Sequence, residues 1–134
     1  SHTYLAGSSL GGLFAAWVAW ERPGVFGGGV GAVSPSCWWA GEALLDLARR
    51  RGDPPVRRFY QDMGTLESGL PRDDDGDGRE DAVARLTTMD SLLTAAGRRP
   101  GVGLKTVVGE GDRHHESAWA KRLPGLLGFL LADE

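Results

Sequence analysis

Hydrophobic residues follow two alternating patterns along the chain, short continuous runs and longer stretches with helical spacing. The short runs predict β-strands over residues 3–6, 30–33, 56–62 and 102–108. Apolar residues three and four positions apart predict helices directly after Ser9 and over 43–50, 82–96 and 118–131. Strands that alternate with helices are typical of a parallel sheet flanked by helices. The pattern therefore predicts an α/β fold with a mostly parallel sheet of about four strands.

Proline, glycine and charged residues separate these elements. The first helix should end near Pro23, because proline cannot continue a helix, and Pro124 should interrupt the last one. We expect loops over 63–69 and 109–116, after the third and fourth strands. The very polar segment 72–81 is expected to be a solvated loop. No repeat or linker divides the chain.

A glycine-rich turn stands between the first strand and the first helix. Its sequence, Gly7-Ser8-Ser9-Leu10-Gly11-Gly12, contains the G-x-S-x-G pattern of a nucleophile elbow, in which a serine occupies a tight strand-to-helix turn. Such a turn projects the Ser9 hydroxyl above the sheet, while Gly7 and Gly11 keep side chains out of the crowded turn. A chain with 21 glycines can contain this pattern by chance. The strand before it and the helix after it nevertheless favour Ser9 as a nucleophile.

A serine nucleophile needs a base that removes its proton and an acid that orients the base. In folds with this turn the order along the chain is serine, acid, histidine, each on a loop beyond the carboxyl end of a strand. His2 precedes the turn, whereas His114 and His115 follow the last strand. We expect the base to be one of these two later histidines.

Two carboxylates stand where the orienting acid is expected. Asp62 ends the third strand, and Glu67 lies in the loop beyond it. Exposed carboxylates in loops are usually only solvated, so position has to decide between the two. Glu67 is favoured because five residues beyond the strand give it the reach to turn toward the histidine.

The overall composition narrows the class of protein. The chain has 134 residues, of which 41% are hydrophobic and 25% charged, as in a soluble globular domain. Its net charge of −3 argues against nucleic-acid partners and anionic membrane surfaces, and it contains no run of eighteen apolar residues. The single cysteine, Cys37, excludes an internal disulfide and is compatible with a reducing compartment. Since no leader-like segment is visible, we expect a cytoplasmic location.

Two acidic clusters raise the alternative of a bound metal. Counted from Asp73, carboxylates occupy positions one, three, five and nine of a calcium-loop pattern and Gly78 occupies position six, but Ala84 stands where the bidentate glutamate belongs. A second cluster consists of Asp112, His114, His115 and Glu116. Adjacent histidines point in different directions and seldom share one metal. We therefore expect solvated loops and no metal.

Several longer segments, in order along nearly the whole chain, form a combined pattern. They are Ala6-Gly7-Ser8-Ser9-Leu10-Gly11-Gly12-Leu13-Phe14, Arg22-Pro23-Gly24-Val25-Phe26, Ser34-Pro35-Ser36-Cys37-Trp38-Trp39, Tyr60-Gln61-Asp62-Met63-Gly64-Thr65-Leu66-Glu67, and His114-His115-Glu116-Ser117-Ala118-Trp119 followed by Arg122-Leu123-Pro124. Together they resemble the esterase D family of α/β-hydrolases. That family includes enterochelin-type siderophore esterases, feruloyl esterases and S-formylglutathione hydrolases.

The resemblance implies a serine esterase that uses no cofactor. Carried over residue by residue, it makes Ser9 the nucleophile, Glu67 the acid and His114 the base. His115 takes the place that the family usually gives to asparagine, so His115 stays open as an alternative base. The implied substrate is a small-molecule ester, with feruloyl, siderophore, short-chain and thioester substrates all as candidates.

Three further roles follow from the resemblance. The backbone N–H of Leu10 would contribute to the oxyanion hole. Trp38 and Trp39 would either wall the substrate pocket or pack under the sheet. These two roles for the tryptophans are equally compatible with the sequence.

The turn stands close to the N-terminus, although several strands of the same sheet normally precede it. We therefore expect residues 1–134 to be the C-terminal part of one α/β-hydrolase domain and the second oxyanion donor to lie in a loop outside this chain. Losing one donor costs about 10²–10³ in rate, so the chain alone should be nearly inactive. The strand over 3–6 would form a bare sheet edge, which favours pairing with another copy or another segment. The alternative function is a non-catalytic α/β-hydrolase fragment or interaction domain, in which the acidic segment from Asp73 could bind calcium.

Overall fold

Four parallel strands form the centre of the molecule. The computed structural model describes residues 1–69, 72–74, 76 and 80–133. The strands are β1 (Tyr4–Ser8), β2 (Gly29–Val33), β3 (Arg58–Leu66) and β4 (Leu104–Arg113), and they lie in the order β1-β2-β3-β4 with every neighbouring pair parallel. The predicted α/β class and the four-stranded parallel sheet are confirmed.

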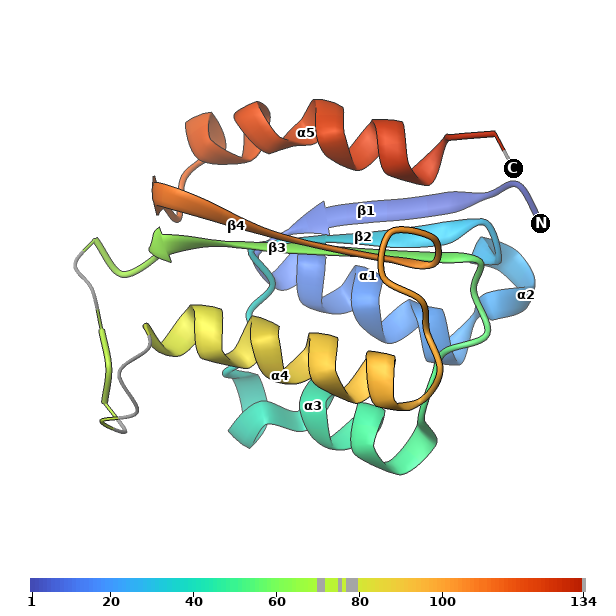
Figure 1. The fold of residues 1–134 in the computed structure, drawn as a ribbon, viewed down its shortest axis with the longest axis horizontal. Coiled ribbons are helices and arrows are strands. Elements are labelled where there is room, and N and C mark those ends of the chain that lie inside the picture. The colour runs from blue at the N-terminus through green and yellow to red at the C-terminus, as the bar shows by residue number, and fades with distance from the viewer. Residues whose placement is uncertain (70–71, 75, 77–79, 134) are drawn as a thin grey trace.

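Helices cover both faces of this sheet. They are α1 (Leu10–Glu21), α2 (Pro23–Phe26), α3 (Trp39–Arg51), α4 (Asp81–Ala95) and α5 (Glu116–Leu130). In Figure 1, α5 lies on one face of the sheet, and α1, α3 and α4 lie on the other. Within α3, residues 40–42 have left-handed φ angles, so its regular part begins at Ala43, where the sequence predicts a helix.

The larger hydrophobic core lies between the sheet and the α1, α3 and α4 layer. Every residue of β2 is buried, as expected for a central strand that helices cover on both faces. Trp20 of α1 meets Phe59 of β3 edge to face, with ring centroids 6.0 Å apart. A smaller cluster under α5 consists of Val33, Tyr60, Leu126 and Leu130. The two clusters hold the sheet in place from both sides.

Both β3 and β4 are longer than the sequence predicts. The expected loop residues 63–66 and 109–113 belong to the two strands, which pair beyond Asp62 and Val108 across an irregularity between Gly64 and Leu66. The extension of β4 consists of glycines and polar residues. In the extension of β3 the apolar Met63 and Leu66 are separated by Gly64 and Thr65, so the hydrophobic signal is weak. A Cβ atom on Gly64 would collide with the Asp112 backbone, which shows how closely the two strands approach.

Two other expectations about the helices need correction. Pro124 does not interrupt the last helix, because α5 runs unbroken past it. Pro124 lies on the exposed side of α5, where water can satisfy the carbonyl that loses its intrahelical donor. The first helix ends at Glu21 as predicted, but Pro23 then starts the short helix α2. This position suits proline, since the first helical residue needs no N–H donor.

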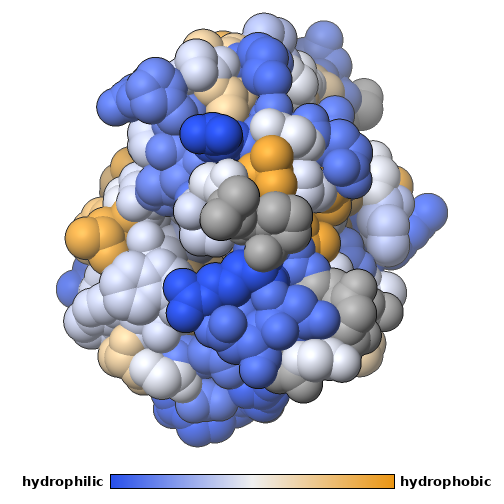
Figure 2. All heavy atoms as spheres, turned by 90° about the vertical axis from the view of Figure 1, so that its left-hand side faces the viewer, coloured by the Kyte–Doolittle hydropathy of each residue, from blue (hydrophilic) through white to orange (hydrophobic). Residues whose placement is uncertain are grey.

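Because the strands are parallel, all four of their carboxyl-terminal ends lie at the same end of the sheet. The residues that directly follow β1, β2, β3 and β4 are Ser9, Ser34, Glu67 and His114. Viewed from that end, the surface is predominantly hydrophilic (Figure 2). In α/β proteins, ligands usually bind at the carboxyl-terminal end of the parallel strands. Within the described part of the chain, no helix is both long and apolar enough to cross a membrane.

Candidate active site

Ser9 occupies a strained turn between β1 and α1. Its φ and ψ are 59° and −122°, which non-glycine residues adopt rarely. The backbone holds this conformation in place, because Ser9 N donates to Val33 O at 2.9 Å and Ser9 O accepts from Leu13 N at 3.1 Å. Backbone strain of this kind is typical of functional sites.

Of the two glycines in the G-x-S-x-G pattern, Gly7 has the predicted role and Gly11 does not. A Cβ atom on Gly7 would lie 2.5 Å from Gly11 O, and one on Gly12 would lie 2.8 Å from Val33 O. A Cβ atom on Gly11 would meet nothing within 4 Å. The expectation that Gly11 keeps a side chain out of the turn is therefore wrong. Gly12, the next residue, has that role because the β2 backbone passes close to it.

A line of hydrogen bonds joins Ser9 to Glu67 through His114. His114 Nε2 lies 2.9 Å from Ser9 Oγ, and His114 Nδ1 lies 2.7 Å from Glu67 Oε2. The imidazole also packs edge to face against Trp119, with ring centroids 5.1 Å apart. The Glu67 side chain is 9% exposed and that of His114 is 37% exposed. His114 is thus accessible to a substrate, while the Glu67 carboxylate that binds it is largely shielded from water.

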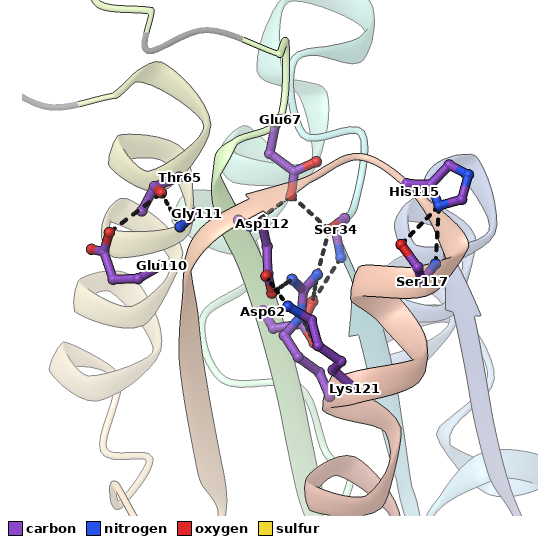
Figure 3. A network of polar contacts seen from close by, with 12 residues as sticks. Ser34, Asp62, Thr65, Glu67, Glu110, Gly111, Asp112, His115, Ser117 and Lys121 are labelled. Carbon is purple, nitrogen blue, oxygen red and sulfur yellow. Dashed lines mark hydrogen bonds and ion pairs between the residues drawn. The ribbon is translucent and has the colours of Figure 1, made fainter.

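The alternative acid and the alternative base lie outside this line. Asp62 is fully buried, and its carboxylate accepts hydrogen bonds from Tyr60 Oη at 2.7 Å and Ser34 N at 2.9 Å. His115 caps α5, because its Nδ1 accepts from Ser117 N at 3.1 Å. Figure 3 shows His115 turned away from Glu67. Glu67 meets the histidine without a long loop, since it directly follows the extended β3 strand.

A second set of contacts holds the other oxygen of Glu67. Glu67 Oε1 accepts from Gly64 N at 2.6 Å and from Ser34 Oγ at 2.7 Å. Ser34 Oγ in turn accepts from Arg122 Nη2 at 2.7 Å. Sequence reasoning assigned no role to Ser34 or Arg122. Both nevertheless lie in the segments that carry the family resemblance, which was the available signal.

Arg122 is buried between two carboxylates. It forms ion pairs with Asp62 at 3.0 Å and with Asp112 at 2.8 Å, and Lys121 Nζ lies 2.5 Å from the other oxygen of Asp112. Burial by itself would lower the pKa of Arg122, but the hydrogen bonds and charges of both aspartates outweigh it and raise that pKa. The hydrogen bond from Lys121 and the contacts of Arg122 lower the pKa of Asp112 despite its burial. The cluster thus pairs the side chains of Arg122 and Lys121 with the carboxylates of Asp62 and Asp112. Figure 3 shows Lys121 and the two aspartates close to Ser34.

A cleft of about 560 Å³ opens over Ser9 and His114. Trp38 lines it together with Ser36, Arg72 and Arg85. Both arginines are already paired with carboxylates, Arg72 with Asp74 at 2.7 Å and Arg85 with Glu42 at 2.9 Å. The cleft thus combines one exposed aromatic wall with two paired arginines and the four carboxylates of Glu67, Asp74, Glu80 and Asp81.

Of the two tryptophans, Trp38 lines the cleft over Ser9 and Trp39 does not. Trp38 is 60% exposed and Trp39 is 51% exposed, so packing under the sheet is excluded for both. Trp39 lines a separate apolar groove of about 440 Å³ together with Leu10, Phe14 and Trp17. As the first residue of α1, Leu10 carries a backbone N–H that has no acceptor within the helix.

The metal alternatives find no support among the described residues. No group of three or more histidine, cysteine, aspartate or glutamate side chains in that part of the chain is placed to hold a metal ion. Asp112 of the second acidic cluster binds Lys121 and Arg122 instead. Asp75, Asp77 and Gly78 of the calcium-loop pattern lie outside the described residues.

Comparisons with known proteins identify the family. The model of the family described as "Putative esterase" matches residues 1–130. The chain belongs to this esterase family. A search of curated protein sequences gives no match.

Solved structures with the same fold include two siderophore hydrolases and a third protein. Siderophore hydrolase EstA from Aspergillus nidulans has a TM-score of 0.70 and 26% identity, over 99% of this chain and 50% of its own. Siderophore hydrolase EstB from the same organism has a TM-score of 0.60 and 25% identity, over 94% and 47%. The BES protein from Bacillus cereus shares the fold with a TM-score of 0.59 and 21% identity, over 95% and 45%. This member of the esterase family thus spans about half the length of these neighbours.

Proposed function

We propose that this chain carries the nucleophile, base and acid of a carboxylic ester hydrolase. The observation that supports the proposal is the hydrogen-bonded line from Ser9 Oγ through His114 to Glu67, at 2.9 Å and 2.7 Å. Each distance lies within the range that proton transfer needs. The membership of the esterase family agrees with this chemistry.

The proposed reaction has two acyl-transfer steps. Ser9 Oγ attacks the ester carbonyl carbon while His114 Nε2 takes the hydroxyl proton. The tetrahedral intermediate collapses, the bond to the alcohol oxygen breaks, and His114 returns the proton to the leaving alcohol. A water molecule then attacks the acyl-enzyme by the same route and releases the acid and free Ser9. Glu67 holds the Nδ1–H of His114 and stabilises the imidazolium that forms in each step.

The Leu10 N–H is the proposed first donor of the oxyanion hole. It stands at the positive end of α1, one residue after Ser9, where charge develops on the carbonyl oxygen. A second donor is expected from a loop outside this chain, because the neighbours are about twice as long. We therefore expect the 134-residue chain alone to be slower by about 10²–10³ than a complete site.

The substrate that we propose is a small-molecule ester. Two of the structural neighbours are siderophore hydrolases, which makes siderophore esters the first class to test. Trp38 offers an exposed aromatic wall beside Ser9, which suits an aromatic or flat acyl group. Feruloyl and short-chain esters complete the test panel.

Labelling with a fluorophosphonate tests the assignment of the nucleophile. The natural protein that contains this chain is treated with the probe, and the modified peptide is mapped by mass spectrometry. We expect the label on Ser9, its loss in Ser9→Ala, and its retention in Ser8→Ala, the matched control on the neighbouring serine. Modification at a different residue would overturn the assignment.

One observation favours a second candidate, a non-catalytic interaction domain. β1 is an outer strand of the sheet, and the adjacent groove is lined by the exposed Leu10, Phe14 and Trp39. An unpaired edge beside apolar side chains favours association with another chain. The two candidates differ in one outcome, because an interaction domain without catalysis does not react with the fluorophosphonate.

A further inference from the structure

Ser34 lies at the same end of the sheet as Ser9, Glu67 and His114, the three residues of the proposed reaction. It directly follows β2, as Ser9, Glu67 and His114 directly follow β1, β3 and β4. Ser34 is 1% exposed and has a φ of 41°, a left-handed conformation that is strained for serine. Its backbone N–H donates to Asp62 Oδ1 at 2.9 Å, and this contact helps to hold the strained residue in place. The fold thus fixes a buried hydroxyl beside Glu67 at a cost in backbone strain.

The direction of the hydrogen bonds at Ser34 is determined by its neighbours. The hydroxyl has one proton, and the Arg122 guanidinium can only donate. Because Ser34 Oγ lies 2.7 Å from Arg122 Nη2, it accepts that hydrogen bond. Its own proton is then free for Glu67 Oε1, also at 2.7 Å. Arg122 therefore aims the Ser34 hydroxyl at the carboxylate.

Arg122 is itself fixed on the side away from Ser34. Asp62 contacts two of its nitrogens, at 3.0 Å and 3.1 Å, and Asp112 contacts the third at 2.8 Å. Asp62 is completely buried and Asp112 is 6% exposed, so these contacts are shielded from water. Hydrogen bonds at both Nη atoms, together with the ion pair at Nε, leave the guanidinium little freedom to turn away from Ser34.

We propose that Ser34, aimed by Arg122, is a positioning residue that fixes the Glu67 carboxylate for His114. With Ser34 and Gly64 N both bound to Oε1, the carboxylate cannot rotate, and Oε2 stays directed at His114 Nδ1. Ser34 does not touch the reacting atoms and acts through Glu67. This proposal rests on the proposed function, in which Glu67 orients the base.

The expected effect is on turnover and not on substrate binding. A hydrogen bond to a charged group is usually strong enough that its loss lowers a rate about 10- to 100-fold. We expect Ser34→Ala to lower kcat by this factor and to change KM less than about twofold. Ser34→Gly should have the same effect, and it relieves the backbone strain because glycine accepts a φ of 41°. This second variant keeps the test valid if Ser34→Ala folds poorly.

Thr106→Val is the matched control for the loss of a hydroxyl. Thr106 lies in β4, and its Oγ1 accepts a hydrogen bond from Gln61 Nε2 at 3.0 Å, away from Glu67. We expect Thr106→Val to lose one hydrogen bond in the sheet and to keep kcat within about twofold of the unchanged protein. Thermal unfolding of each variant shows whether it is folded during the assay.

A double-mutant cycle separates positioning from a structural role. Kinetics with a p-nitrophenyl ester are measured for the natural protein, Ser34→Ala, Glu67→Ala and the double variant. If Ser34 acts through Glu67, Ser34→Ala costs little more once Glu67 is absent. The same loss in both backgrounds, or Ser34 variants equal to Thr106→Val, would overturn the proposal while leaving the esterase intact. Turnover that does not depend on Ser9 would instead overturn the proposed function, and the role of Ser34 with it.

Discussion

At the scale of single residues, the four strand ends each contribute one side chain to a continuous polar chain. Ser9, His114, Glu67 and Ser34 follow one another at hydrogen-bond distance, and Arg122 ends the line between its two aspartates. Ser9 and His114, at the exposed end of this series of hydrogen bonds, face the cleft. Arg122, at the buried end, belongs to an ionic cluster with two aspartates. The hydrogen bonds to the buried cluster thus restrict the movement of the side chains that face the cleft.

Cys37 shows how burial controls reactivity beside the site. The thiol is 3% exposed, and burial raises its pKa from 9.0 to about 12, although the nearby Arg85 partly offsets this rise. We expect native protein to react very slowly with a disulfide reagent at pH 8, and urea-unfolded protein to react with one equivalent at once. Rapid reaction of the native protein would contradict the burial of this thiol.

The same shift of the Cys37 pKa predicts how stability depends on pH. The unfolded thiol loses its proton near pH 9, whereas the folded thiol keeps its proton up to about pH 12. Between these pH values, loss of the thiol proton increasingly stabilises the unfolded state. The stabilising contribution of the Cys37 thiol to the free energy of unfolding is therefore present below pH 9 and falls as the pH rises. Urea unfolding of the native chain and of Cys37→Ala across this window isolates the contribution.

At the scale of elements, the turn from β1 into α1 depends on close backbone approach. Gly7 faces the Gly11 carbonyl, and Gly12 faces the β2 backbone at Val33, so α1 starts directly against the sheet. The site therefore depends on the position of α1 against the sheet as well as on the identity of Ser9.

Two alanine substitutions test this packing. We expect Gly7→Ala to lower the free energy of unfolding by about 1–3 kcal/mol, because its Cβ would lie 2.5 Å from a backbone oxygen. Gly11→Ala is the matched control, and we expect it to stabilise the helix by about 0.5–1 kcal/mol, since its Cβ meets nothing within 4 Å. Urea unfolding measures both. Equal effects of the two substitutions would contradict the close approach at Gly7.

The elements also show where sequence reasoning works and where it fails. Hydrophobic spacing located the four strands and the four longer helices, because their apolar faces pack against the two cores. It missed the ends of β3 and β4, because Gly64 and Gly109 pair through the backbone without hydrophobic side chains and β4 continues through polar residues. Sequence reasoning correctly placed Glu67 in the loop after β3, but expected it five residues beyond the strand, whereas Glu67 directly follows the longer strand.

At the scale of the whole molecule, a group of exposed apolar side chains lies on one side of the described residues. The total accessible area is 6836 Å², close to the roughly 6,800 Å² expected for a compact protein of this mass. The unusual feature is therefore the distribution of apolar surface and not its amount. The exposed Leu10, Phe14, Trp17 and Trp39 lie together on α1 and α3, beside the outer strand β1.

We expect the 134-residue chain by itself to associate in solution through this side. Phe14→Lys, at a residue that is 56% exposed, should weaken association while leaving the fold intact. Leu123→Lys is the matched control on α5, at a residue that is 45% exposed on the opposite face of the sheet. Sedimentation velocity distinguishes the species. A strictly monomeric unsubstituted chain would contradict this expectation.

The sequence by itself determined the strand-turn-helix pattern at Ser9, the alternation of elements and the order of serine, acid and histidine. These features are local or depend only on order, so they are readable from spacing and residue type. The sequence favoured Glu67 and left His115 open beside His114; the tertiary structure showed that His114 contacts Ser9 and that Glu67 contacts His114. It alone revealed Ser34 and Arg122 behind Glu67. The physical reason is that the lengths and register of parallel strands decide which side chains share an edge, and backbone pairing through glycines leaves no mark in the hydrophobic pattern.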